Sequence, residues 1–139
     1  MLNLDEMSQM KILLIEKDNQ LRDELVQEFI KEGSSIIAVE SAREAVECLK
    51  EDRFDVIVSD FISAAGENLK LIKLADKHFP NSVKIGIVAS GGIDSCPSLA
   101  GCGLDDIIRK PFPFVSLLYS ISQHMENKSS SASQALAAS

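Results

Sequence analysis

The stretch DVIVSD, residues 55–60, is predicted to form the central strand of a sheet. It joins two aspartates through three β-branched aliphatic residues and a serine, so that it is largely apolar on both faces. A strand of this kind is typical of a parallel sheet that helices cover on both sides. The stretch therefore predicts an α/β fold in which Asp60 ends a buried strand.

Strand-like and helical patterns alternate on either side of this stretch. Further strands are predicted at residues 11–15, 35–39, 83–90 and 105–111, and helices at residues 21–32, 42–52, 68–79 and 114–125. Gly33 supplies the residue that ends the first helix, and Ser41 with Glu44 forms a capping box at the start of the second. Five βα units at this spacing imply one five-stranded parallel sheet with right-handed crossovers and helices on both faces.

Length and composition bound the domain organisation. A chain of 139 residues, with 45% hydrophobic and 25% charged residues, is sufficient for one globular domain. We expect a peripheral N-terminal segment at residues 1–10 and one domain at residues 11–126. We expect residues 127–139 to be a disordered Ser/Ala-rich tail, because they show no periodic apolar face.

Charge and hydropathy exclude several classes of function. The net charge of −7 argues against a direct nucleic-acid partner, because phosphate binding needs clustered Lys and Arg. No apolar run approaches the length of a membrane span. The first ten residues are acidic and lack the basic and apolar stretches of a secretory signal, so we expect a cytoplasmic protein.

Polar side chains follow four of the predicted strands, where they would share one edge of the sheet. These residues are Glu16, Lys17 and Asp18 after the first strand, Asp60 after the third, Ser90 after the fourth and Lys110 after the fifth. Carboxylates suit Mg²⁺, an aspartate can form an acyl phosphate, and a hydroxyl and an ammonium can bind phosphoryl oxygens. Each residue alone is weak evidence, since Asp60 could equally cap the turn after its strand. Together they favour phosphoryl transfer.

The chain resembles the receiver domain of response regulators, the CheY-like family, over residues 11–125. FDVIVSD (residues 54–60) resembles the phosphoacceptor strand, VASGG (residues 88–92) the end of the fourth strand, and GLDDIIRKPF (residues 103–112) the fifth-strand signature. The resemblance implies a doubly wound, flavodoxin-like sheet of strand order 2-1-3-4-5. It also implies a two-component signalling protein that a sensor histidine kinase or a phosphotransfer protein phosphorylates.

The same resemblance implies roles for the residues at the strand ends. Asp60 would be the phosphoacceptor, Ser90 the switch hydroxyl, and Lys110 the residue that pairs with the phosphoryl group. The bond between Lys110 and Pro111 would be a cis peptide. Ala89 is the alternative register for the switch position and would leave no hydroxyl there.

The resemblance further implies a Mg²⁺ site formed by Glu16 and Asp60, with weaker contributions from Asp18 and the backbone of Ser63. The chain departs from the family here, because Lys17 stands where the family places a second acid that ligates the metal. The Lys17 ammonium would either pair with Asp60, in the space meant for Mg²⁺, or extend into solvent and leave a weak metal site.

Two further departures concern the switch. Ile107 stands where the family has an aromatic residue that reports the switch.

Residues 91–103, GGIDSCPSLAGCG, should hold the fourth helix. Glycine disfavours a helix by roughly 1 kcal/mol per residue and interior proline by roughly 3 kcal/mol, so we expect this helix to be short or irregular. The family's surface for a downstream protein comprises the fourth helix, the fifth strand and the fifth helix.

Two functions remain open from the sequence. The first is a phosphorylated receiver domain, which is no conventional enzyme and at most catalyses phosphoryl transfer to, and hydrolysis from, its own Asp60. The second is a pseudo-receiver, a protein interaction module independent of phosphorylation, because Lys17 replaces a metal ligand. A flavodoxin-like cofactor binder is disfavoured, because no Gly-, Ser- and Thr-rich phosphate loop follows the first strand.

Overall fold

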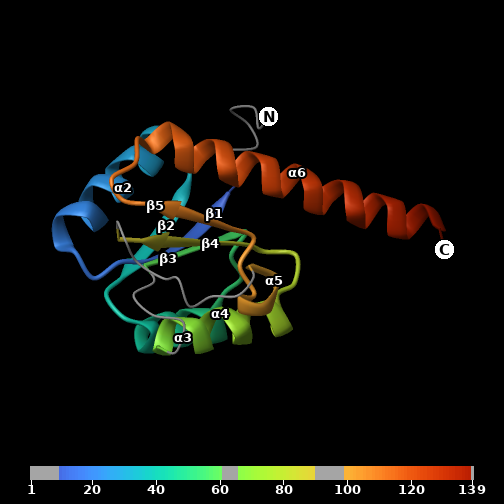
Figure 1. The fold of residues 1–139 in the computed structure, drawn as a ribbon, viewed down its shortest axis with the longest axis horizontal. Coiled ribbons are helices and arrows are strands. Elements are labelled where there is room, and N and C mark those ends of the chain that lie inside the picture. Colours follow the sequence, from blue (N-terminus) through green and yellow to red (C-terminus); the bar gives the residue numbers. More distant parts are fainter. Residues whose placement is uncertain (1–9, 61–65, 90–98, 139) are drawn as a thin grey trace.

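The fold is a five-stranded parallel sheet in the order β2-β1-β3-β4-β5 (Figure 1). The computed structural model describes residues 10–60, 66–89 and 99–138. Its strands are β1 (Lys11–Ile15), β2 (Ser35–Val39), β3 (Val56–Asp60), β4 (Val83–Val88) and β5 (Asp106–Arg109). Its helices are α2 (Asn19–Lys31), α3 (Ala42–Glu51), α4 (Glu67–His78), α5 (Leu99–Cys102) and α6 (Phe114–Ala138). The predicted sheet and its strand order are confirmed.

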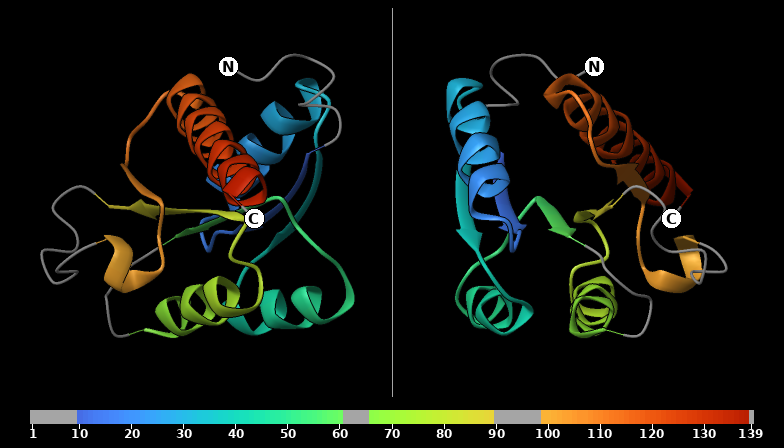
Figure 2. Two further views of the ribbon diagram at one scale, coloured as in Figure 1. Left: turned by 90° about the vertical axis from the view of Figure 1, so that its right-hand side faces the viewer. Right: turned by 60° about the vertical axis from the view of Figure 1, so that its left-hand side comes forward.

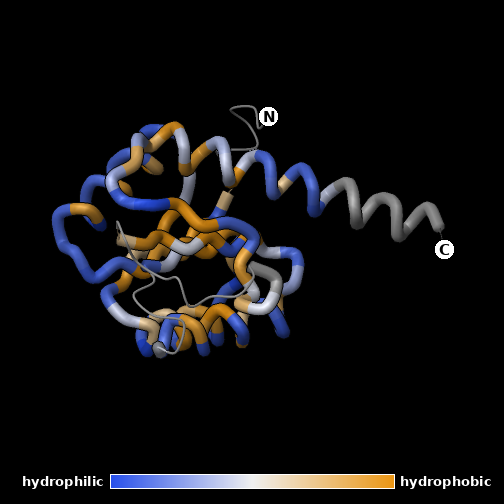
Figure 3. The backbone as a smooth tube through the Cα atoms, in the orientation of Figure 1, coloured by the Kyte–Doolittle hydropathy of each residue, from blue (hydrophilic) through white to orange (hydrophobic). Residues whose placement is uncertain are grey.

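Helices cover both faces of the sheet, with α2 and α6 on one face and α3, α4 and α5 on the other (Figure 2). Alternate residues of each inner strand point to opposite faces, so that Val58 packs under α2 and α6 while Ile57 packs under α3 and α4. Every residue of β3 is buried, as its apolar pattern predicts. The hydrophobic residues accordingly gather on the strands and on the inner sides of the helices (Figure 3).

The sequence signals for helix ends are found where they were predicted. Ser41 is the N-cap of α3, and its hydroxyl accepts a hydrogen bond from the backbone N–H of Glu44 at 3.3 Å. Gly33 follows α2 with a φ of +88°, the left-handed conformation that glycine adopts without strain. The α2 helix begins at Asn19, two residues before the predicted start, because Asp18 caps it.

Three segments extend or modify the predicted boundaries. Met10, assigned by sequence to a peripheral segment, is buried in the core under α2 and α6. The α5 helix has four residues, in agreement with the short helix predicted for this region; residues 90–98 lie outside the described part. The α6 helix continues through residues 127–138, where a disordered tail was predicted, because alanine favours helix and elongation is inexpensive after nucleation. The domain boundary at residue 126 stays a prediction.

A buried cation, Lys84, lies near the start of β4, at the opposite end of the strand from the carboxyl edge. The Lys84 side chain is fully buried; its ammonium donates a hydrogen bond to the Phe79 carbonyl at 2.6 Å and pairs with Asp76 at 3.3 Å. Burial lowers the pKa of Lys84, since removal from water disfavours the charged form.

Within residues 10–60, 66–89 and 99–138, no helix combines the length and the apolar character needed to cross a bilayer.

Candidate functional site

Two buried carboxylates and a lysine converge at the carboxyl edge of the sheet. β1 and β3 are adjacent, and the pairing of Ile15 with Ser59 places Glu16 beside Asp60. Lys110 follows β5 and donates its backbone N–H to the Val88 carbonyl at 2.8 Å, so it belongs to the same edge. The exposed fractions are 1% for Glu16 and 7% for Asp60. The sheet thus brings together three of the residues that the sequence selected.

Glu16 is held by contacts to both of its carboxylate oxygens. Oε1 lies 3.0 Å from the Lys110 ammonium, and Oε2 accepts a hydrogen bond from the Asp18 backbone N–H at 3.0 Å. Burial raises the pKa of Glu16, while the Asp18 N–H and the Lys110 ammonium lower it. Apart from the Lys110 ammonium, Oε1 has no hydrogen-bond partner in the described part, so it retains capacity to accept a further contact.

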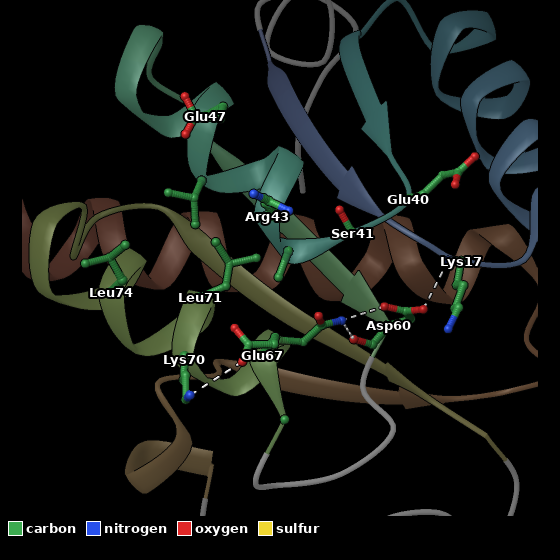
Figure 4. Close-up of a pocket in the computed structure, with 14 residues that line it drawn as sticks. Lys17, Glu40, Ser41, Arg43, Glu47, Asp60, Glu67, Lys70, Leu71 and Leu74 are labelled. Atoms are coloured by element: carbon green, nitrogen blue, oxygen red, sulfur yellow. Dashed lines mark hydrogen bonds and ion pairs between the residues drawn. The ribbon is translucent and has the colours of Figure 1, made fainter.

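Asp60 receives hydrogen bonds from two directions. The Lys17 backbone N–H donates to Oδ2 at 3.1 Å (Figure 4). The side-chain amide of Asn68, in the first turn of α4, donates to Oδ1 at 2.6 Å and lies 2.5 Å from the Asp60 carbonyl oxygen. Hydrogen-bond donors therefore contact both carboxylate oxygens of the predicted phosphoacceptor.

Lys17 contacts Asp60 through its main chain and not through its ammonium. The Lys17 side chain is exposed, and no ion pair joins it to Asp60 within the part of the chain that the structure describes. Of the two arrangements expected from the sequence, extension into solvent is the one found. The position nevertheless supplies no carboxylate to a metal.

Asp18 serves as the N-cap of α2. Its Oδ1 accepts hydrogen bonds from the backbone N–H groups of Gln20 at 2.9 Å and Leu21 at 3.2 Å. Such a cap typically contributes about 1 kcal/mol to the stability of a helix. The cap engages one oxygen of Asp18; a role for this residue as a weak metal ligand stays a prediction.

A cavity of about 850 Å³ opens beside Asp60 and runs between α3 and α4 (Figure 4). Lys17 and Asn68 line it near Asp60, and Leu71 and Leu74 line it between the helices. Asp60 thus borders the cavity although the residue as a whole is nearly buried.

A family model for the response regulator receiver domain matches residues 12–122. The chain belongs to this family. Receiver domains are the signal-accepting modules of two-component systems, so the fold and the two-component context predicted from the sequence are confirmed.

Three relatives illustrate how far the likeness extends. This chain is 28% identical over 114 residues to the response regulator protein FleR of Pseudomonas aeruginosa. The aligned residues make up 82% of this chain and 24% of FleR. The chain thus spans about a quarter of that relative's length. A signal receiver domain from Vibrio parahaemolyticus superposes with a TM-score of 0.74 at 20% identity, covering 88% of this chain and 95% of that one. This second likeness shows the fold alone.

The third relative is the beryllofluoride-activated NtrC4 receiver domain dimer. It superposes with a TM-score of 0.74 at 25% identity, covering 85% of this chain and 98% of that one.

Receiver domains typically bind Mg²⁺, and the residues of this receiver domain fit such an ion in part. Glu16 and Asp60 are neighbouring carboxylates, and in the described ranges the Lys110 ammonium is the one polar contact of Glu16 Oε1. However, no group of three or more His, Cys, Asp or Glu side chains in the described ranges is arranged to hold a metal ion. The two carboxylates therefore fit a weakly held Mg²⁺.

The switch residues of this receiver domain are described only in part. Ser63 and Ser90 lie outside the described residues, so their predicted roles stay predictions. Ile107 is half-buried on β5 and packs against the core under α3 and α4. The cis peptide bond predicted between Lys110 and Pro111 is confirmed.

Sequence reasoning did not select Asn68. Its side chain contacts Asp60 across eight positions of sequence, and the helical pattern alone assigns it only to the exposed start of a helix. No local sequence pattern signals this contact.

Proposed function

We propose that this receiver domain accepts a phosphoryl group on Asp60 from a sensor histidine kinase or a phosphotransfer protein. The observation that carries the proposal is the setting of Asp60, which ends a central strand, adjoins the buried Glu16 and faces an open cavity. A carboxylate in this position is accessible to a donor and close to a second acid that can share a cation.

In the proposed reaction, a carboxylate oxygen of Asp60 attacks the phosphorus of a phosphohistidine. The new O–P bond forms as the P–N bond to the donor breaks, and the leaving imidazole nitrogen takes up the electron pair and then a proton. Mg²⁺, held by Glu16 and Asp60, would neutralise the charge that develops on the phosphoryl oxygens. Lys110 and Ser90 would bind those oxygens, and Asp18 and the Ser63 backbone would add weak metal contacts.

The proposed activity is self-catalysed phosphoryl transfer and hydrolysis and not turnover of a separate substrate. A histidine kinase or phosphotransfer protein is then the upstream partner, in the cytoplasm. The downstream partner would be a protein that binds the face built by α5, β5 and α6. The half-buried Ile107 on this face would replace the aromatic switch residue by an aliphatic one.

The test uses a small phosphodonor. We expect acetyl phosphate with Mg²⁺ to add the mass of one phosphoryl group to the wild-type protein and not to Asp60→Asn. Asp23→Asn is the matched control, because Asp23 is an exposed residue of α2 and should leave the mass gain unchanged. Equal mass gain in Asp60→Asn would place the modification elsewhere and contradict the proposal.

The second candidate is a pseudo-receiver that binds partners without phosphorylation. Lys17 favours it, because this residue removes the carboxylate that the family uses as a direct metal ligand. The same measurement of mass gain with acetyl phosphate distinguishes the two functions. Absence of a mass gain, together with absence of Mg²⁺ and beryllofluoride binding by NMR titration, would defeat phosphorylation and support the pseudo-receiver.

A further inference from the structure

The side chain of Asn68 forms hydrogen bonds that join the start of α4 to the predicted phosphoacceptor, Asp60. Its amide nitrogen lies 2.6 Å from Asp60 Oδ1 and 2.5 Å from the Asp60 carbonyl oxygen. The N-cap of α4 is Gly66, which provides no side-chain hydrogen bond to the helix. The first turn of α4 is thus attached to the end of β3 through an amide that contacts a reacting carboxylate.

The contact is a charge-assisted hydrogen bond. Hydrogen bonds to an ionised acceptor are roughly twice as strong as neutral ones, and a setting that is only 7% exposed at Asp60 limits competition from water. The carboxylate charge is delocalised over both oxygens. The amide of Asn68 therefore stabilises the anion whichever oxygen attacks the phosphorus.

Phosphorylation weakens this contact. When an oxygen of Asp60 forms a bond to phosphorus, the negative charge lies on the phosphoryl oxygens of the resulting acyl phosphate, and its two carboxyl oxygens accept a hydrogen bond from an amide less strongly than those of the carboxylate. An interaction that is stronger in the reactant than in the transition state raises the barrier. The hydrogen bond from Asn68 is an interaction of this kind.

We propose that Asn68 restrains the phosphorylation of Asp60 and that its release on phosphorylation frees the first turn of α4. This inference rests on the proposed function of Asp60. In this proposal, the rate at which Asp60 is phosphorylated is controlled from α4, which lies on the face of the sheet opposite α6. Asn68 touches the reacting carboxylate, and its effect is on the rate of the reaction and on the position of α4.

The first experiment needs no phosphodonor. In ¹H–¹⁵N spectra of the full chain, we expect the Asn68 side-chain amide to move toward its random-coil position in Asp60→Ala. It should stay in place in Asp18→Ala, which removes a carboxylate from the helix cap and not from Asn68. An Asn68 amide signal that is the same in wild type and Asp60→Ala would overturn the inference.

The second experiment measures rate. With acetyl phosphate and Mg²⁺, we expect Asn68→Ala to gain the phosphoryl mass about tenfold faster than wild type, the effect of one lost hydrogen bond to a charged group. Asn68→Leu, of similar volume but without a donor, should be accelerated as well. The control Glu67→Gln alters the exposed neighbour in the same turn and should react at the wild-type rate.

The outcomes separate the inference from the function on which it rests. Phosphorylation of wild type and Asn68→Ala at equal rates would overturn the inference and leave the proposed function intact. Acceleration in Asn68→Ala alone would assign the effect to added space and would likewise overturn it. If neither protein gains mass, the proposed function fails, and the rate claim for Asn68 fails with it.

Discussion

The backbone N–H of Lys17, and not its ammonium, donates to Asp60 Oδ2, at 3.1 Å. The position that departs most from the family therefore keeps its main-chain contact to the acceptor while its side chain lies exposed. Because the contact does not depend on the side chain, residue 17 can be substituted without removing a hydrogen bond from Asp60. The charge at this position can thus be tested separately from the geometry.

Lys17→Asp should tighten Mg²⁺ binding by about tenfold, because it removes a cation and adds a carboxylate close to Glu16 and Asp60. Titration by calorimetry or NMR measures the change. Lys17→Gln, which only removes the charge, should give a smaller gain. Equal affinities in all three proteins would mean that position 17 lies outside the metal site.

Asp18→Ala should lower the free energy of unfolding by about 1 kcal/mol, because the N-cap of α2 loses its acceptor. Asp18→Asn should restore most of this stability, since its amide oxygen can accept the same hydrogen bonds. Urea denaturation without metal measures both. If Asp18→Asn keeps the stability but weakens Mg²⁺ binding, the residue is also a metal ligand.

Glu16→Gln should remove from the metal-free protein a loss of stability that wild type undergoes as the pH rises toward neutral. The pKa of Glu16 is raised, mainly by burial, so the stability linked to this group is present below the usual glutamate range and is lost as the pH rises through the raised pKa. The variant should therefore match wild type near pH 4 and exceed it above that pH. Thermal denaturation in EDTA across this range measures the difference. A constant difference at all pH values would contradict this account.

Lys84→Met should raise the free energy of unfolding at neutral pH by about 1 kcal/mol, because wild type holds a charged group in the core and its partner Asp76 is half exposed. The pKa of Lys84 is lowered by burial, so wild-type stability rises with pH between this pKa and the usual lysine value. The advantage of Lys84→Met should thus shrink as the pH rises toward the usual lysine pKa of about 10.5 and level off above it. Lys84→Ala is the contrasting variant, since it leaves a cavity and should destabilise.

The parts of the fold that depend on local pattern were predictable from the sequence. The apolar stretch that ends at Asp60, the capping signal at Ser41 and the glycine at position 33 each act over a few residues, and each appears in the structure where the pattern placed it. Parallel strands bring their carboxyl ends to one edge, so Glu16, Asp60 and Lys110 could be grouped before their distances were known.

Details that depend on tertiary approach were not predictable. The contact between Asn68 and Asp60 depends on how α4 is placed against β3, and a helical pattern does not specify that placement. The sequence left open whether the Lys17 ammonium pairs with Asp60 or extends into solvent, because its long side chain can adopt either arrangement, and it did not predict the hydrogen bond from the Lys17 backbone N–H. Asp18 was selected for its charge, whereas its position one residue before α2 makes it a cap.

The buried ammonium at the start of β4 gives this protein a built-in chemical reporter. Acylating reagents modify neutral, accessible amines, and Lys84 has no exposed surface in the folded chain. Its labelling must therefore wait until the chain opens, while surface lysines such as Lys73 are labelled directly. The rate at which mass spectrometry finds Lys84 modified would report how often the core under α4 is exposed, without any probe being introduced.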